Sequence, residues 1–212
     1  MGKPMTPSIT SGQIGKLQDL IGAALRKSDL PGDIVQKVIE SDGEQLVADM
    51  LASLYMRVEA RANEIALHVT VDRTRTPKQA LAATGRRLYG NDLVVDAMPH
   101  GEGDEVELVF FKPEASAYQN GLLLCQALMR EYEKRNLVPD PIALAAFAKK
   151  DPAFCDAKPF GCQWQDADGN YCYATFDRWD DERYVDVGRY GSDWHVYWSF
   201  AGVRKKSSAS AL

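Results

Sequence analysis

Four cysteines and one histidine have the widest range of possible chemistry in this chain: Cys125, Cys155, Cys162, Cys172 and His195. Thiolate and imidazole groups are the usual ligands of structural zinc. Four of these residues could therefore in principle hold one zinc ion: Cys155, Cys162, Cys172 and His195. Such sites bring their ligands in closely spaced pairs, whereas each cysteine here stands alone in the sequence. We therefore predict packed free thiols and no metal site, in a reducing compartment.

The segment 166–170 begins like a calcium-binding loop, with oxygen-bearing side chains at alternate positions. A calcium loop of the EF-hand type needs a glutamate at its twelfth position and helices on both sides. That position is Asp177 here, and the flanking residues alternate as strands do. The segment therefore predicts a β-hairpin turn rather than a calcium site.

Nucleophilic catalysis would need a serine or cysteine beside a base, and no candidate in this chain stands in a nucleophile elbow or a cysteine-protease motif. His195 follows Trp194 at the start of the last predicted strand, and it is a weak candidate for catalytic proton transfer. No cofactor motif stands out, so we expect no cofactor.

Five basic residues form the best candidate for contact with nucleic acid: Arg73, Arg75, Lys78, Arg86 and Arg87. A helix predicted from residue 76 to about 88 would place part of this cluster on one face. The net charge of −5 opposes a large phosphate-binding surface, and no helix-turn-helix or RNA-binding motif accompanies the cluster. We expect solvated surface charge, with nucleic-acid binding through these residues as an alternative.

Large aromatic side chains are concentrated in the last fifty residues. Trp179, Tyr190 and Trp194 lie near predicted turns, and Tyr197 lies on the face of the last strand that also carries His195. Exposed tryptophan and tyrosine are favoured anchors for binding, so these four aromatic residues are the predicted binding residues. The alternative is that the aromatic side chains only fill the core of a small sheet.

The N-terminal part, residues 1–62, predicts an all-α module. A capping box at Thr10 and Gln13 opens the first helix, and Pro31 opens a second. Ser41 and Glu44 form a further capping box that predicts the start of a third helix. Each helix has an apolar stripe, which must be buried against another helix or a partner. We expect this module to bind a protein partner or to self-associate.

Residues 63–206 predict a mixed α+β domain. The alternation of apolar residues and the turn signals predict strands at 67–71, 93–95 and 106–111, helices at 76–88, 118–135 and 142–148, and a four-stranded antiparallel β meander over 160–205. Residues 207–212 are small and polar, and they predict a disordered tail.

The last third of the chain resembles a set of bacterial and phage-like proteins that end in a Trp-Asp…Phe-x-x-Val-Arg-Lys strand. The matching residues are Asp193-Trp194, in reversed order, and the segment from Phe200 to Lys205. These proteins also have a Pro-containing segment before a short helix, matched here by Leu137-Val138-Pro139 and Leu144. This resemblance runs from about Val69 to Lys205, and it implies an origin on a prophage or mobile element but no particular activity.

The order of elements is also similar to that of prokaryotic C-type-lectin-like domains, found in sulfatase-modifying and phage-receptor-binding families. The shared order is an apolar helix, a Leu-x-Pro step, a short helix and an aromatic meander. The usual Leu-Pro-Thr-x-x-Glu motif is replaced here by Val138-Pro139-Asp140-Pro141. The cysteine pair of the formylglycine-generating enzymes has no assignable counterpart. The resemblance implies a binding scaffold rather than an enzyme.

Together these features favour an α+β, cytoplasmic, non-enzymatic protein that binds a ligand or another protein. The N-terminus lacks the charged start and apolar run of a secretory signal, and no apolar stretch is long enough to cross a bilayer. The alternative is a small enzyme whose site lies between the meander and the helix 118–135 and uses His195 or a cysteine.

Overall fold

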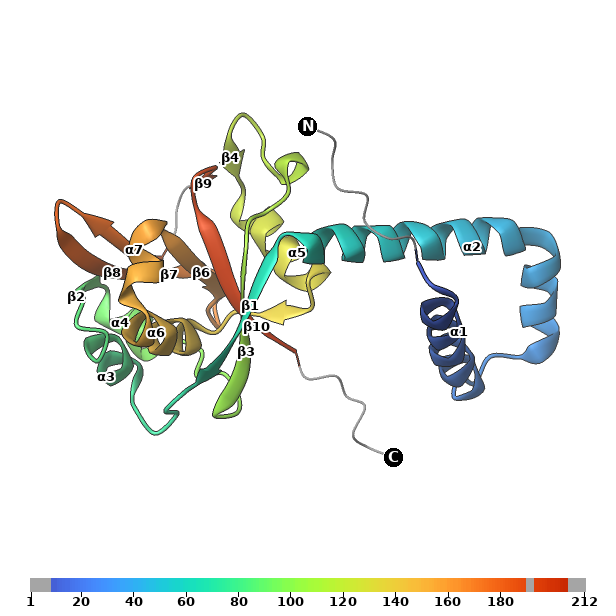
Figure 1. Ribbon diagram of the computed structural model, residues 1–212, viewed down its shortest axis with the longest axis horizontal. Coiled ribbons are helices and arrows are strands. Elements are labelled where there is room, and N and C mark those ends of the chain that lie inside the picture. The colour runs from blue at the N-terminus through green and yellow to red at the C-terminus, as the bar shows by residue number, and fades with distance from the viewer. Residues whose placement is uncertain (1–8, 190–192, 206–212) are drawn as a thin grey trace. The chain divides into compact units, whose positions relative to one another are not determined.

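A computed structural model describes residues 9–189 and 193–205 of the chain, apart from the side chains at positions 52, 55–57, 59, 60 and 157. Contacts divide the chain into two compact units, Met1–Ser53 and Leu54–Leu212 (Figure 1). The secondary structure changes from helix to strand after residue 62, as the sequence predicts, although the contacts divide the chain earlier. The predicted tail at 207–212 lies outside the described residues.

Helix α1 (Ser11–Arg26) begins where its capping box predicts. The hydroxyl oxygen of Thr10 accepts a hydrogen bond from the backbone N–H of Gln13 at 3.3 Å, and Oε1 of Gln13 accepts one from the backbone N–H of Thr10 at 2.8 Å. These reciprocal bonds satisfy two backbone donors that an α-helix leaves unpaired at its start. The whole length of α1 lacks buried residues, so its apolar stripe is exposed.

Helix α2 (Gly32–Ala62) is continuous, and the predicted start of a separate helix at Ser41 is wrong. The hydroxyl of Ser41 donates a hydrogen bond to the carbonyl of Lys37 at 2.9 Å, the i−4 bond of a serine inside a helix. A serine in this geometry bends a helix rather than ending it, and Figure 1 shows α2 as one ribbon that bends before its midpoint. Side-chain bonds from Gln36 to Glu40 and from Gln45 to Asp49 support the helix on both sides of Ser41.

An eight-stranded mixed sheet dominates the second unit within the described residues, which confirms the α+β class. Seven strands follow one another across it in the order β1 (Glu64–Thr70), β3 (Glu105–Phe111), β10 (Ser199–Arg204), β6 (Phe160–Gln165), β7 (Tyr171–Trp179), β8 (Glu182–Arg189) and β2 (Arg87–Gly90). The eighth, β5 (Leu137–Val138), pairs with β10 off this path. A separate pair joins β4 (Leu122–Leu123) to β9 (Trp194–His195).

The predicted meander is confirmed for β6, β7 and β8 but not for the last strand. The segment predicted as one strand from Trp194 forms β9 and β10, and β10 pairs with β3 and β6 in the middle of the sheet. Its residues 199–203 are all buried. A strand that is apolar on both faces belongs at the centre of a sheet, because an edge would leave one of those faces partly in water.

Seven described helices complete the chain: α1, α2, α3 (Pro77–Ala82), α4 (Asp92–Asp96), α5 (Cys125–Lys134), α6 (Pro141–Lys150) and α7 (Pro152–Ala157), with a short 3₁₀ turn at Ala115–Ala117. The strand predicted at 93–95 is wrong, because Asn91 caps α4 through its side chain. The helix predicted to reach residue 88 ends at Ala82, before Gly85 at φ +68°. The helix predicted from 118 begins at Cys125, because Asn120 and Gly121 have positive φ and form a turn before β4.

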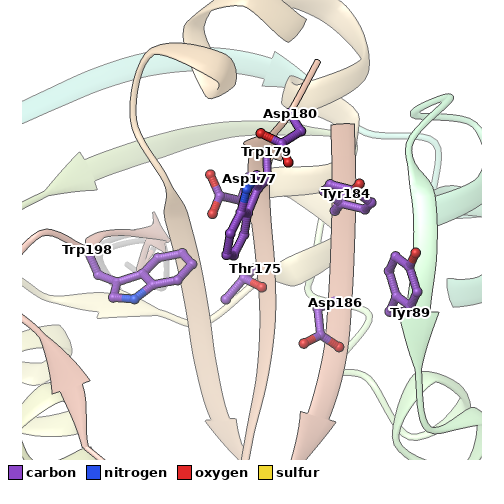
Figure 2. A pocket seen from close by; sticks show the side chains of 8 residues that line it. All are labelled: Tyr89, Thr175, Asp177, Trp179, Asp180, Tyr184, Asp186 and Trp198. Carbon is purple, nitrogen blue, oxygen red and sulfur yellow. The ribbon is translucent and has the colours of Figure 1, made fainter. Parts of the chain in front are cut away.

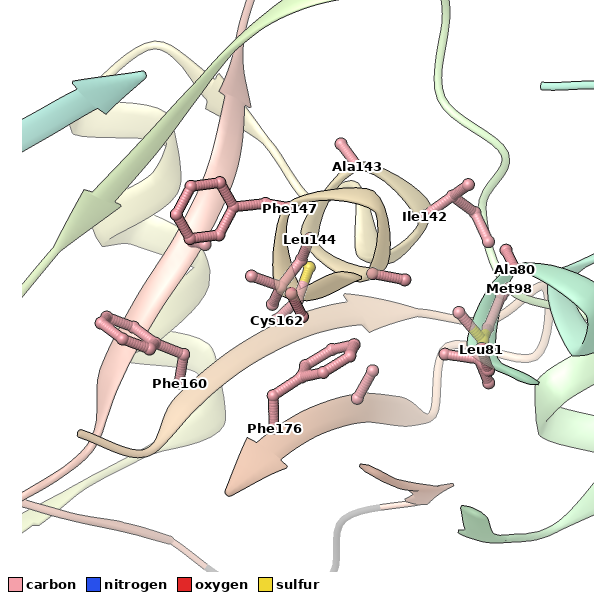
Figure 3. Packing of buried hydrophobic residues seen from close by; sticks show 14 of the residues in the cluster. Ala80, Leu81, Met98, Ile142, Ala143, Leu144, Phe147, Phe160, Cys162 and Phe176 are labelled. Atoms are coloured by element: carbon pink, nitrogen blue, oxygen red, sulfur yellow. The ribbon is translucent and has the colours of Figure 1, made fainter. Parts of the chain in front are cut away.

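Buried apolar residues form two clusters in the sheet unit. The larger lies between the sheet and helices α3, α4, α6 and α7, and Figure 3 shows Leu144 of α6 next to Cys162 of β6. The smaller includes residues of α5, β3, β4 and β10, with Trp194 of β9 in its interior. Gly161 of β6 makes room for that indole, because a Cβ there would lie 3.2 Å from the Trp194 ring.

Candidate functional site

The strands β7 and β8 place alternate side chains on opposite faces of the sheet. On β7, Cys172, Ala174 and Phe176 belong to the larger core cluster. The residues between them therefore point to the other face, where Thr175 pairs with Asp186 of β8. The smaller cluster covers this face over β3, β10, β6 and the start of β7, where Tyr171 and Tyr173 pack against it. It leaves the face open over the rest of β7, β8 and β2.

A hollow with a volume of about 540 Å³ lies on this open face, hereafter the aromatic pocket (Figure 2). Its aromatic lining residues are Tyr89, Trp179, Tyr184 and Trp198. Its polar lining residues are Thr175, Asp177, Asp180 and Asp186. Figure 2 shows these side chains coming from β2, β7, β8, the turn between β7 and β8, and the segment before β10.

The aromatic side chains differ in how firmly they are held. Trp198 is half-buried and packs edge-on against the buried Trp194, with ring centroids 5.4 Å apart. The rings of Tyr89 and Tyr184, on neighbouring strands, contact each other with their centroids 5.5 Å apart. Trp179 is 71 % exposed at the end of β7, so its indole is available to a ligand. The pocket thus combines the braced ring of Trp198 with accessible rings, of which that of Trp179 is the most exposed.

Three carboxylates give the aromatic pocket a negative character. Asp177 accepts a hydrogen bond from the backbone N–H of Arg178 at 2.7 Å, and Asp186 accepts one from the hydroxyl of Tyr173 at 3.0 Å. Within the described residues, no ion pair neutralises Asp177, Asp180 or Asp186. Asp180 has a φ of +45° in the turn after Trp179, which fixes it at the rim.

The four predicted binding residues have different positions. Trp179 lines the aromatic pocket, and Tyr190 lies outside the described residues. The prediction that Trp194 is partly exposed is wrong: its ring is fully buried, and its Nε1 donates to Oε1 of Gln163 at 2.7 Å. Tyr197 is exposed but stacks on His195 outside the pocket lining, with centroids 5.6 Å apart.

Of the lining residues, the sequence predicted Trp179 and missed the other seven: Tyr89, Thr175, Asp177, Asp180, Tyr184, Asp186 and Trp198. The signal that could have found part of this set is the alternation on β7 and β8, where Thr175, Asp177 and Trp179 share one face. Tyr89 gave no such signal, because its segment reads as the end of a helix.

The catalytic candidates do not come together in the described part of the chain. His195 is exposed, and no described hydrogen bond or ion pair joins its imidazole to a carboxylate or thiol. All four cysteines are buried, as predicted. Burial raises the pKa of Cys125 to about 11 and that of Cys155 to about 12, so these thiols are protonated at neutral pH.

The basic cluster does not form a shared face. Arg86 and Arg87 lie beyond the end of α3, so the prediction of a common helical face with Lys78 is wrong. Each of the five side chains pairs with a carboxylate: Arg73 with Asp140, Arg75 with Asp72, Lys78 with Asp92, Arg86 with Asp156 and Arg87 with Glu182. Arg73 and Arg86 are also mostly buried. These basic charges are therefore largely compensated within the fold.

The predicted turn at 166–170 is confirmed. Oδ1 of Asp166 accepts hydrogen bonds from the backbone N–H groups of Asp168 and Asn170, and its carboxylate pairs with Arg189 at 2.9 Å. The described residues contain no group of three or more His, Cys, Asp or Glu side chains arranged to hold a metal ion.

Comparison with family models, curated proteins and solved structures found no match for this chain. The resemblances to phage-like proteins and to C-type-lectin-like domains therefore stay predictions. Among the described helices, none combines the length and the apolar character that crossing a bilayer requires.

Proposed function

We propose that this protein is a non-enzymatic ligand-binding protein and that its ligand occupies the aromatic pocket. The observation that carries the proposal is the exposed indole of Trp179 beside a hollow whose other wall, Trp198, is braced by the core. Large apolar rings that stay in water at the edge of a concave surface are typical of binding sites. The ligand would gain apolar contact without a rearrangement of the sheet.

The packing of the smaller cluster supports binding over the enzymatic alternative. That alternative places a site between the meander and the helix at Cys125–Lys134. The buried side chains of Trp194 and Gln163 occupy this space. Nε2 of Gln163 donates a hydrogen bond to the carbonyl oxygen of Cys125 at 2.8 Å. The described lining of the aromatic pocket contains no histidine or cysteine.

Nuclear magnetic resonance of the tryptophan indole N–H groups tests the proposal in the full chain. We would add separately a set of organic cations, neutral sugars and organic anions. At least one of these three classes of compound should change the chemical shifts of the indole N–H groups of Trp179 and Trp198. The chemical shift of the buried Trp164 should stay the same. Trp179→Ala should abolish the effect, and Leu93→Ala, which removes an exposed apolar side chain outside the pocket, should not. No response to any class, or a response retained in Trp179→Ala, would contradict the proposal.

A second proposed role concerns the N-terminal helices, whose apolar side chains are exposed. Leu17, Leu20 and Leu25 of α1 and Leu46 and Leu51 of α2 each have at least 36 % of their surface in water. Helices gain most of their stability from packing, so such faces are normally covered. We propose that a second copy of the chain covers them. Both charge signs occur beside the stripe, as with Lys16 and Asp19, so two copies meeting about a two-fold axis can pair them.

A further inference from the structure

We infer that the ligand of the aromatic pocket is an organic cation: a substituted ammonium group whose carbon atoms contact the aromatic rings and whose charge faces the carboxylates. This inference rests on the proposed ligand-binding function and adds the ligand's chemical class.

The charge of the lining is the first argument. Asp177, Asp180 and Asp186 line the pocket, and its described lining contains no lysine or arginine. Asp177 and Asp186 occupy diagonal positions on neighbouring strands, because Asp177 pairs with Tyr184 and Asp186 with Thr175. Diagonal side chains on one face lie roughly 7–8 Å apart, so the two carboxylates are close enough for one cation to lie between them. An anion would meet like charges on the same side of the pocket.

The aromatic rings are the second argument. A cation is attracted to the face of an aromatic ring, most strongly to that of tryptophan, and the attraction grows as water is excluded. Trp179 and Trp198 both border the pocket, together with Tyr89 and Tyr184. The protein already shows this contact at the rim, where the guanidinium of Arg87 lies 5.1 Å from the ring centroid of Tyr89. That guanidinium also pairs with Glu182, so its charge is compensated.

The kind of polar group in the lining is the third argument. The hydroxyl of Tyr184 donates to Glu182 at 2.9 Å, and the hydroxyl of Tyr173, which reaches the same face, donates to Asp186 at 3.0 Å. The other donors of the lining, on Tyr89, Thr175, Trp179 and Trp198, are neutral, whereas all of its charged groups are carboxylates. A substituted ammonium group needs from its site acceptors, negative charge and apolar surface, which this lining supplies.

Choline and its uncharged carbon analogue 3,3-dimethylbutan-1-ol provide the direct test, because they differ in charge and hardly in shape. We expect choline to move the indole signals of Trp179 and Trp198 and to bind about tenfold or more tightly than the analogue. A short glycine peptide with one trimethylated lysine is a second arm. Tighter binding of the peptide would identify a protein side chain as the source of the ammonium group, and tighter binding of choline a free small molecule.

Removing the negative charges of the pocket tests the same inference from the side of the protein. Asp177→Asn with Asp186→Asn should weaken choline about tenfold and leave the carbon analogue unchanged. Glu133→Gln removes an exposed carboxylate of α5 outside the pocket, and it should change neither. Equal binding of choline and the analogue, or choline binding that survives the double substitution, would overturn the inference.

The failure of the inference and that of the proposed function are distinguishable. If a neutral sugar or an organic anion moves the signals of Trp179 and Trp198 and choline does not, the ligand-binding function stands and the cation inference is wrong. If no probe moves them, both are wrong.

Discussion

Two tryptophans show how burial separates a binding side chain from a structural one. The indole of Trp179 is 71 % exposed beside the aromatic pocket, and that of Trp194 is fully buried and donates a hydrogen bond to Gln163. Both residues occur in the same aromatic segment of the sequence, next to predicted turns. Their different surroundings predict different consequences of substitution.

Trp194→Ala should lower the free energy of unfolding by about 3–5 kcal/mol, because it leaves a large cavity and removes the hydrogen-bond donor to Oε1 of Gln163. Trp179→Ala should change it little, since the ring is mostly in water. Urea unfolding followed by circular dichroism measures both. A large destabilisation by Trp179→Ala would show that this ring supports the fold rather than a ligand.

The cysteines predict an unreactive native state. The thiolate is the reactive form, and a pKa of about 11 leaves about one Cys125 thiol in a thousand ionised at pH 8. Burial also raises the pKa of Cys162 and Cys172. At pH 8 a thiol-specific reagent should modify none of the four cysteines quickly in the folded protein and all four in denaturant. Rapid modification of one thiol in the folded protein would contradict this prediction and would support that cysteine as a catalytic residue.

At the scale of elements, Asp156 joins helix α7 to the sheet. Its carboxylate pairs with Arg183 at 2.7 Å, with the buried Arg86 at 3.3 Å and with Arg178 at 3.8 Å. The hydrogen bond from Arg183 holds the pKa of Asp156 below its usual value. Folding therefore favours the ionised form, which stabilises the protein fully at neutral pH and progressively less as the pH falls below about 4.

Asp156→Asn should lower the free energy of unfolding at pH 7 by about 3 kcal/mol, because Arg86 stays buried without its carboxylate. The variant should also lose part of the wild-type decline in stability below about pH 4. Asp181→Asn is the matched control, since Asp181 pairs with Arg178 in water and its loss should have little effect. An unchanged acid profile in Asp156→Asn would contradict the assigned role.

Thr10 and Ser41 both begin a capping-box pattern in the sequence, but only Thr10 caps a helix, because α2 is continuous through Ser41. Thr10 caps α1, so Thr10→Ala should lower helix stability by about 1 kcal/mol. Ser41 lies inside α2, so Ser41→Ala should be neutral or slightly stabilising, because alanine is the better helix former. Far-ultraviolet circular dichroism during thermal unfolding compares them. Equal losses would indicate that Ser41 caps a separate helix.

At the scale of the whole molecule, the exposed leucines of the N-terminal helices predict a dimer. Leu20→Glu with Leu51→Glu places charge on both apolar faces, and it should convert the full chain to a monomer in light scattering. Leu93→Glu is the control, because Leu93 is 79 % exposed on α4 in the other unit. A wild-type chain that is already a monomer at micromolar concentrations would contradict the proposed self-association.

Local signals predicted the elements that depend on neighbouring residues. The helix predicted from residue 76 forms as α3, with a capping box between Thr76 and Gln79 at its start, and the predicted turn at 166–170 joins β6 to β7. Two of the wrong secondary-structure predictions concern segments whose conformation depends on pairing with strands far away in the sequence. Arg87 to Gly90 became a strand because β8 supplies parallel hydrogen bonds, and the segment after Trp194 divided because β10 pairs with β3 and β6.

The sequence by itself determined the α+β class, the aromatic meander and the residue types available to a site, because periodicity, caps and turns act over a few residues. The tertiary structure decided which aromatic rings are accessible. Alternation on β7 specifies two faces, but only the packing of Trp194 and α5 shows which part of one face is covered. The aromatic pocket exists because that cover ends within β7, before Thr175, a consequence of contacts between residues far apart in the chain.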